Sequence, residues 1–264
     1  MFAPAHLRVP GRDRAILIGS LVAIAVTAWL ALWLWEGSPY GHFLNHDGNV
    51  GAGAGVAGTT GASLAIGAAA FTVGWTLMIV AMMLPSSVPL VVTFGALVGR
   101  RARPMRLVGL LLVGYLLVWA AFGLAAWAAD RGVHAAVEAL PWLEAHPELI
   151  IGGTLLAAGL WQFSPLRDRC LDECRSPLGF VLNRWRGVSE RREALLMGIA
   201  HGAFCVGCCW SLMLVMFGVG ISSLTAMLVL GGLTAIEKNL PQGRRLTRPL
   251  GVALVLAAVY AVAA

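Results

Sequence analysis

Long apolar runs, separated by short connections that hold almost all of the arginines, restrict this chain more than any other feature. A bilayer core of about 30 Å needs roughly 20 apolar residues in a helix. Only 12% of the 264 residues are charged, about half the share of roughly 25% that is typical of soluble domains. The sequence predicts an all-α, polytopic membrane helical bundle with about seven transmembrane helices, at residues 15–35, 68–97, 107–129, 148–164, 194–217, 221–237 and 248–263.

The basic residues predict the orientation of this bundle. All of the 19 basic residues except Arg131 lie in four segments, 1–14, 98–106, 165–193 and 238–248. With seven spans these segments face the same side, which the positive-inside rule makes cytoplasmic. The N-terminus is therefore predicted to be cytoplasmic, in a multi-pass protein of the bacterial inner membrane. Because the positive charge is confined to short connections, the net charge of +6 does not indicate binding to nucleic acid.

These runs also divide the chain into parts. Residues 1–14 are predicted as a cytoplasmic N-terminus and residues 15–35 as a first transmembrane anchor, retained because no small-residue cleavage site follows. Residues 36–67 form a glycine-rich outer loop. Residues 68–264 form the membrane bundle, within which residues 165–193 are expected as a cytoplasmic loop.

Two patterns outside the main candidate site have more than one interpretation. His42 and His46 of the outer loop are either solvated or ligands of a metal ion. Residues 75–82 and 210–217 share Trp, Leu, Met and Val at matching positions. This similarity indicates either a 3+3 inverted repeat after the first helix, which would place a site near the midplane, or a chance match between apolar segments.

The segment 201–213 brings metal-binding side chains into an apolar run. Cys205, Cys208 and Cys209 lie within five residues, with His201 one turn before and Met213 one turn after. At about 100° per residue these donors share about half of the helix circumference, and Cys205 and Cys208 fall near mid-membrane. A single buried cysteine is an ordinary small hydrophobe, but three thiols with an imidazole predict a site. Thiolate and thioether ligands favour Cu(I), with zinc as the second choice.

Four further residues are candidate ligands of the same metal. Met82 and Met83 precede Pro85 in the second span, where a proline is expected to kink or break the helix and expose carbonyls to a cavity. Cys170 and Cys174 form a C-x3-C pair in the expected cytoplasmic loop. In a reducing compartment this pair is either a metal-transfer site or two unpaired surface thiols.

Glu237 and Lys238 close the sixth span. Glu237 is interpreted as a proton acceptor or hard ligand at the end of a metal pathway. The alternative is an interfacial anchor in which Lys238 snorkels towards water.

Several motifs between residues 65 and 240 belong to one pattern: Trp75, Met78 and Ala81-Met82-Met83-x-Pro85; Gly114-Tyr115, Trp119 and Phe122; Gln162, Leu166 and Cys170-Leu-x-x-Cys174-Arg-x-Pro177; Gly198 and His201-Gly-x-x-Cys205-x-Gly-Cys208-Cys209-Trp210-x-Leu-Met213; and Ala235-x-Glu237-Lys238. In this pattern the chain resembles the family of predicted metal-binding integral membrane proteins of bacteria. The Cys-x-x-Cys-Cys-Trp core is its most specific part. The resemblance implies metal binding within the membrane and implies no particular reaction.

The sequence therefore favours a Cu(I)-handling membrane protein that binds or transports copper, or metallates a partner, rather than an enzyme. Its partners would be the bilayer, the metal ion and either a membrane protein or further copies of itself. A thiol–disulfide electron-transfer protein using Cys205 and Cys208 is the alternative. A haem protein with His201 as ligand and a purely structural subunit are weaker ones. The chain holds no G-x-x-x-x-G-K-[ST] nucleotide-binding motif.

Overall fold

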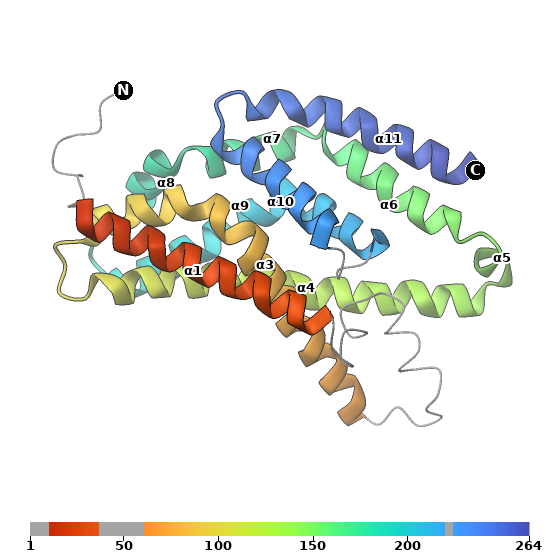
Figure 1. Cartoon of the computed structure of the whole chain (residues 1–264), viewed down its shortest axis with the longest axis horizontal. Coiled ribbons are helices and arrows are strands. Elements are labelled where there is room, and N and C mark those ends of the chain that lie inside the picture. The colour runs from red at the N-terminus through yellow and green to blue at the C-terminus, as the bar shows by residue number, and fades with distance from the viewer. Residues whose placement is uncertain (1–10, 37–60, 220–223, 264) are drawn as a thin grey trace.

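A computed structural model describes residues 11–36, 61–219 and 224–263 (Figure 1). Within these ranges every regular element is a helix, which confirms the all-α prediction. His42, His46 and most of the glycine-rich segment lie outside the described residues. The elements are α1 (Gly11–Glu36), α3 (Gly61–Val98), α4 (Pro104–Ala139), α5 (Pro141–Glu144), α6 (Glu148–Trp161), α7 (Pro165–Arg175), α8 (Pro177–Arg184), α9 (Glu190–Val219), α10 (Leu224–Asn239), the short 3₁₀ helix η3 (Gly243–Leu246) and α11 (Thr247–Ala263).

Five stretches of the described helices are long and apolar enough to cross a membrane: Asp13–Trp35, Leu64–Val98, Pro104–Ala139, Glu190–Met216 and Gly243–Ala263. The helix α6 reaches this length only together with α7, and the two meet at an angle of 65°. The helix α10 coincides with residues 224–237 of the predicted span 221–237, whose first three residues lie outside the described residues. The structure thus supports a membrane-spanning bundle by length and composition.

The helix α3 continues through Pro85, where a kink or break was predicted. It is one helix from Gly61 to Val98, and Figure 1 shows it changing direction along its length. Pro85 has no N–H, so the carbonyl of Ala81, four residues earlier, loses its helical partner. The indole Nε1 of Trp29 in α1 donates to that carbonyl over 3.2 Å. The α1 helix therefore satisfies the group that the proline leaves free, and α3 does not need to break.

The helices α4 and α9 pack closely because glycines face each other's backbones. A methyl group added at Gly198 would meet the backbone of Leu111, and one added at Gly114 would meet the backbone of Leu195 and Ile199. Small residues allow such close approach between membrane helices. This contact fixes α9 against α4 along its first half.

A Gly198→Ala substitution is therefore expected to lower the thermal unfolding midpoint in mild detergent. Its free energy of unfolding should fall by about 1–3 kcal/mol, as for other overpacked cores. The matched control is Gly109→Ala in α4, where an added methyl group meets nothing within 4 Å. Equal midpoints for the two variants would contradict the close approach of α4 and α9.

The segment 165–193, expected as a loop, contains α7 and α8 and leads into α9 through a capped turn. Gly187 adopts a positive φ of 74°. The Glu193 carboxylate accepts hydrogen bonds from four backbone N–H groups, those of residues 186–189, over 2.7–3.1 Å. A carboxylate at this place satisfies the free N–H groups at a helix start. The helix α7 packs against α9 inside the bundle, which changes the surroundings of its two cysteines.

Candidate metal centre

The thiols of Cys205, Cys208 and Cys209 lie in the core of the bundle. Their residues are 0%, 2% and 1% exposed. The whole predicted donor face of α9 is buried with them: Met197, His201, Met213 and Met216 are at most 3% exposed. This face meets α3 at Ser87 and Met83, α4 at Tyr115 and α10 at Lys238.

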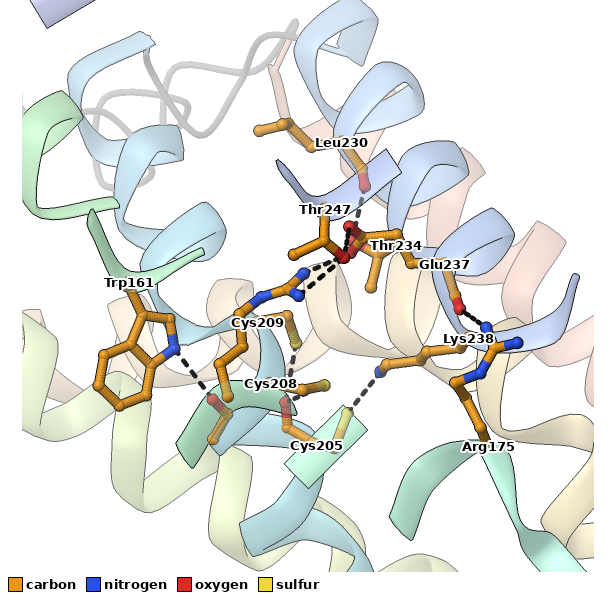
Figure 2. Close-up of polar contacts among 12 residues, drawn as sticks. Trp161, Arg175, Cys205, Cys208, Cys209, Leu230, Thr234, Glu237, Lys238 and Thr247 are labelled. Atoms are coloured by element: carbon orange, nitrogen blue, oxygen red, sulfur yellow. Dashed lines mark hydrogen bonds and ion pairs between the residues drawn. The ribbon is translucent and has the colours of Figure 1, made fainter. Parts of the chain in front are cut away.

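Cys205 is the best-connected of the three thiols. Its Sγ lies 2.9 Å from the Nζ of Lys238 in α10 and 3.2 Å from the hydroxyl of Tyr115 in α4. The thiols of Cys208 and Cys209 both point back to the Cys205 carbonyl, over 3.1 Å and 2.9 Å. Figure 2 shows the three cysteines together, with the Lys238 side chain reaching towards them. One turn of α9 thus presents three sulfur atoms next to a lysine ammonium.

The methionines predicted beside the thiols take different positions. The Sδ of Met83 lies 3.9 Å from the Sγ of Cys209, so α3 supplies a thioether directly to the cluster. The side chain of Met82 packs against Gly231 of α10. Met213 is fully buried in the same core, one turn beyond Cys209. Of these three, Met83 is the one that contacts a thiol.

The helix α7 brings the C-x3-C pair to the same cluster. The Cys170 side chain lies over Gly207 of α9, where an added methyl group would come within 2.6 Å of its sulfur. Cys174 packs against the core cluster that contains Cys205, Cys208 and Cys209. Cys170 is buried and Cys174 is partly exposed. The expected separation between a cytoplasmic pair and a membrane cluster is therefore not found: all five cysteines lie around one helix–helix contact.

Glu237 faces away from the sulfur atoms. Its Oε2 is 2.7 Å from Nη2 of Arg167, and its Oε1 accepts from the hydroxyl of Thr247 over 3.1 Å. Both charged side chains are at most 2% exposed. Arg175 donates to the backbone carbonyls of Glu237 and Leu240 at the end of α10. Glu237 and these arginines connect α7 to α10, and both Glu237 carboxylate oxygens are engaged in hydrogen bonds.

His201 occupies an aromatic pocket next to the thiols. Its Nε2 lies 3.3 Å from the Ser87 hydroxyl, and its ring stacks on Tyr115 at 5.5 Å and meets Phe180 edge-on. Its Nδ1 is buried and has no hydrogen-bond partner among the described residues. The structure therefore places this predicted ligand one turn from the cluster, with one ring nitrogen already directed to α3.

The donor set can be compared with the requirements of a soft ion. Within the described ranges no group of three or more His, Cys, Asp or Glu side chains is arranged to hold a metal ion, so these residues do not form a preassembled tetrahedral site of the structural zinc type. The donors that do meet are thiols and the Met83 thioether, with carboxylates directed elsewhere. Sulfur ligands in low number suit Cu(I).

Two residues of this centre were not identified from the sequence. Lys238 was interpreted as a snorkelling anchor, but it is 5% exposed and contacts Cys205. Tyr115 appeared only as part of a motif, yet its hydroxyl contacts the same thiol. A signal for Lys238 was present, because it is the only lysine in a chain with 18 arginines.

The comparisons with known proteins point in the same direction. Residues 72–261 match the family described as PpoB2, copper chaperone. No curated protein and no solved structure matches the chain. The matched range includes α4 to α10 in full and every residue of the thiol cluster, and it covers more than half of the sequence. The chain is therefore a member of the PpoB2 copper chaperone family.

Proposed function

We propose that this protein holds Cu(I) within the membrane and transfers it to a partner. The ligands would be two at a time of the three thiols of Cys205, Cys208 and Cys209, with Cys205 as one of the two. The observation that carries the proposal is the burial of three adjacent thiols beside the Met83 thioether, while Arg167 and Thr247 hold both carboxylate oxygens of Glu237. Thiolate and thioether ligands favour soft ions, and Cu(I) suits both kinds of ligand. Copper is the cargo in this proposal, and zinc is a weaker competitor for the same thiols.

Transfer would proceed by exchange of sulfur ligands. The Cys174 thiol would lose its proton as its sulfur binds Cu(I), the Cu(I)–Cys208 bond would break, and the released Cys208 thiolate would take up that proton, with no change of oxidation state. Cys174 suits this step because it packs against the thiol cluster and is partly exposed. The acceptor would be a protein that offers its own soft ligands. Cys170, packed over Gly207, would keep α7 in contact with α9.

The same proposal includes the membrane topology. In Figure 1 the α3–α4 turn, α8 and the start of α11 lie towards one end of the bundle, whereas α5 and the C-terminus lie towards the other. The arginine-rich segments 98–106, 165–193 and 238–248 include these parts of the first end, which supports a cytoplasmic position for it in the bacterial inner membrane. A seven-span arrangement, with α10 and the bent α6–α7 pair as spans, remains part of the proposal, and so does the inverted repeat.

The test is elemental analysis of the protein purified in mild detergent after reconstitution with Cu(I) under reducing conditions. Wild type is expected to retain copper through a desalting column, and the Cys205/Cys208/Cys209→Ser variant is expected to lose nearly all of it. Equal copper contents would overturn the proposal. If wild type holds no copper and the Cys208→Ser variant instead accumulates as a mixed disulfide, the thiol–disulfide alternative would be favoured.

A further inference from the structure

The thiol cluster contains a buried cation of the protein's own. The Nζ of Lys238 lies 2.9 Å from the Cys205 thiol, 3.4 Å from the Ser86 hydroxyl and 3.9 Å from the Met83 thioether. Only 5% of the residue is exposed. Within the described part of the chain its hydrogen-bond partners come from α3 and α9. The ammonium thus lies among the atoms that would ligate copper, as Figure 2 shows for Cys205.

No carboxylate in the described residues neutralises this charge. The adjacent Glu237 uses both carboxylate oxygens on Arg167 and Thr247. The polar atoms that Lys238 contacts are instead the Cys205 thiol, the Ser86 hydroxyl and the Met83 thioether. A buried charge is costly unless it is paired. A negative charge left on the sulfur atoms by metal binding would pair with the Lys238 ammonium.

We infer that Lys238 is a specificity-determining residue that makes the thiol cluster favour a monovalent over a divalent ion; this inference rests on the proposed copper function. When Cu(I) binds two thiols, each thiol gives up its proton to solvent. Two thiolates and one Cu(I) leave one negative charge, which the ammonium cancels. A divalent ion on the same two thiolates would leave the site with a net positive charge. The metal changes no oxidation state in either case.

The Lys238 charge should affect metal affinity strongly because the site is buried. In a low-dielectric interior, a net charge within a few ångströms of the metal changes the binding equilibrium by at least about tenfold. Removing the ammonium reverses the preference, because the Cu(I) complex then carries an uncompensated negative charge and the divalent complex becomes neutral. Lys238 is thus predicted to raise Cu(I) affinity and to lower zinc affinity through the same charge.

The test measures the dissociation constants of Cu(I) and Zn²⁺ by chelator competition on wild type, Lys238→Gln, Lys238→Leu and Lys238→Arg in detergent. The ratio of the zinc constant to the copper constant is expected to fall at least about tenfold in both neutral variants. It is expected to stay near the wild-type ratio in the arginine variant, which keeps the charge. The matched control is Asn239→Ala, which removes an uncharged contact from α10 to the Ser86 carbonyl.

The outcomes separate the two proposals. A wild-type protein that does not bind Cu(I) would defeat the proposed function itself. A wild-type protein that binds Cu(I), with neutral variants that lose affinity for both ions equally, would overturn the inference about Lys238 alone. Two neutral variants are used so that the result does not depend on one that folds poorly, and folding is checked by circular dichroism and gel filtration.

Discussion

A Cys205→Ser substitution is expected to weaken Cu(I) binding by about 100-fold or more. Replacing a residue that merely supports a metal ligand typically lowers metal affinity by about 10–100-fold. Cys205 is proposed as a ligand itself, so the loss should be larger. Its sulfur is also the atom to which Lys238 and Tyr115 are directed. Serine keeps the size of the side chain and replaces the soft donor by a hard one, which Cu(I) binds poorly.

The measurement is Cu(I) affinity by competition with a chromophoric chelator. The matched control is Ser211→Ala, which changes a buried hydroxyl group on the same helix, at 1% exposure, without removing a sulfur. That variant is expected to bind copper within about threefold of wild type, which corresponds to less than 1 kcal/mol. If Cys205→Ser binds as tightly as Ser211→Ala does, Cys205 is not a ligand.

The second large effect concerns stability. A Glu237→Ala substitution is expected to lower the free energy of unfolding by about 3–5 kcal/mol, because it leaves a buried arginine without its partner. Arg167 is 0% exposed and its Nη2 is 2.7 Å from the Glu237 carboxylate. The loss of this pair would also loosen the connection between α7 and α10. The effect is read from denaturant titration in mixed micelles.

The control for this prediction is Glu173→Ala, which breaks a partly exposed ion pair with Arg184. Exposed pairs contribute only about 0–1 kcal/mol. Glu237→Ala should therefore unfold at a much lower denaturant concentration than Glu173→Ala. Similar midpoints would show that the buried pair does not hold α7 to α10.

The fold class could be predicted from the sequence because membrane-spanning helices consist of long apolar runs, which are visible in the sequence. The runs 107–129 and 194–217 lie within α4 and α9. The continuity of α3 could not be predicted in the same way. It depends on Trp29 of a different helix, which satisfies the carbonyl that Pro85 leaves free, and such a tertiary contact leaves no local pattern.

In the site, too, some features follow from local sequence and others depend on tertiary contacts. The one-sided distribution of Cys205, Cys208 and Cys209 follows from helix geometry, and all three are buried as that geometry requires. The position of Lys238 does not follow from geometry alone. At a helix end, a lysine can turn towards water or towards the core, and the choice depends on what the neighbouring helix offers. Here α9 offers Cys205, so the ammonium turns inwards.

The packing of α7 against α9 could not be predicted from the sequence for a related reason. Arginines at 167 and 175 made the segment look like a solvent-exposed cytoplasmic loop. In the structure Arg167 pairs with Glu237, and Arg175 caps the carbonyls at the end of α10. A charge count cannot distinguish a solvated arginine from one that a buried partner neutralises. Cys170 and Cys174 reach the thiol cluster because of these pairings.

The most direct test of the central claim is X-ray absorption at the copper edge of the Cu(I)-loaded wild-type protein. We expect a first coordination shell of few sulfur atoms, from the thiols of α9 with Met83 as the neighbouring thioether. We also expect this shell to disappear in the Cys205/Cys208/Cys209→Ser variant. A first shell of nitrogen and oxygen atoms in wild type, or an unchanged sulfur shell in the variant, would contradict the assignment of copper to these cysteines.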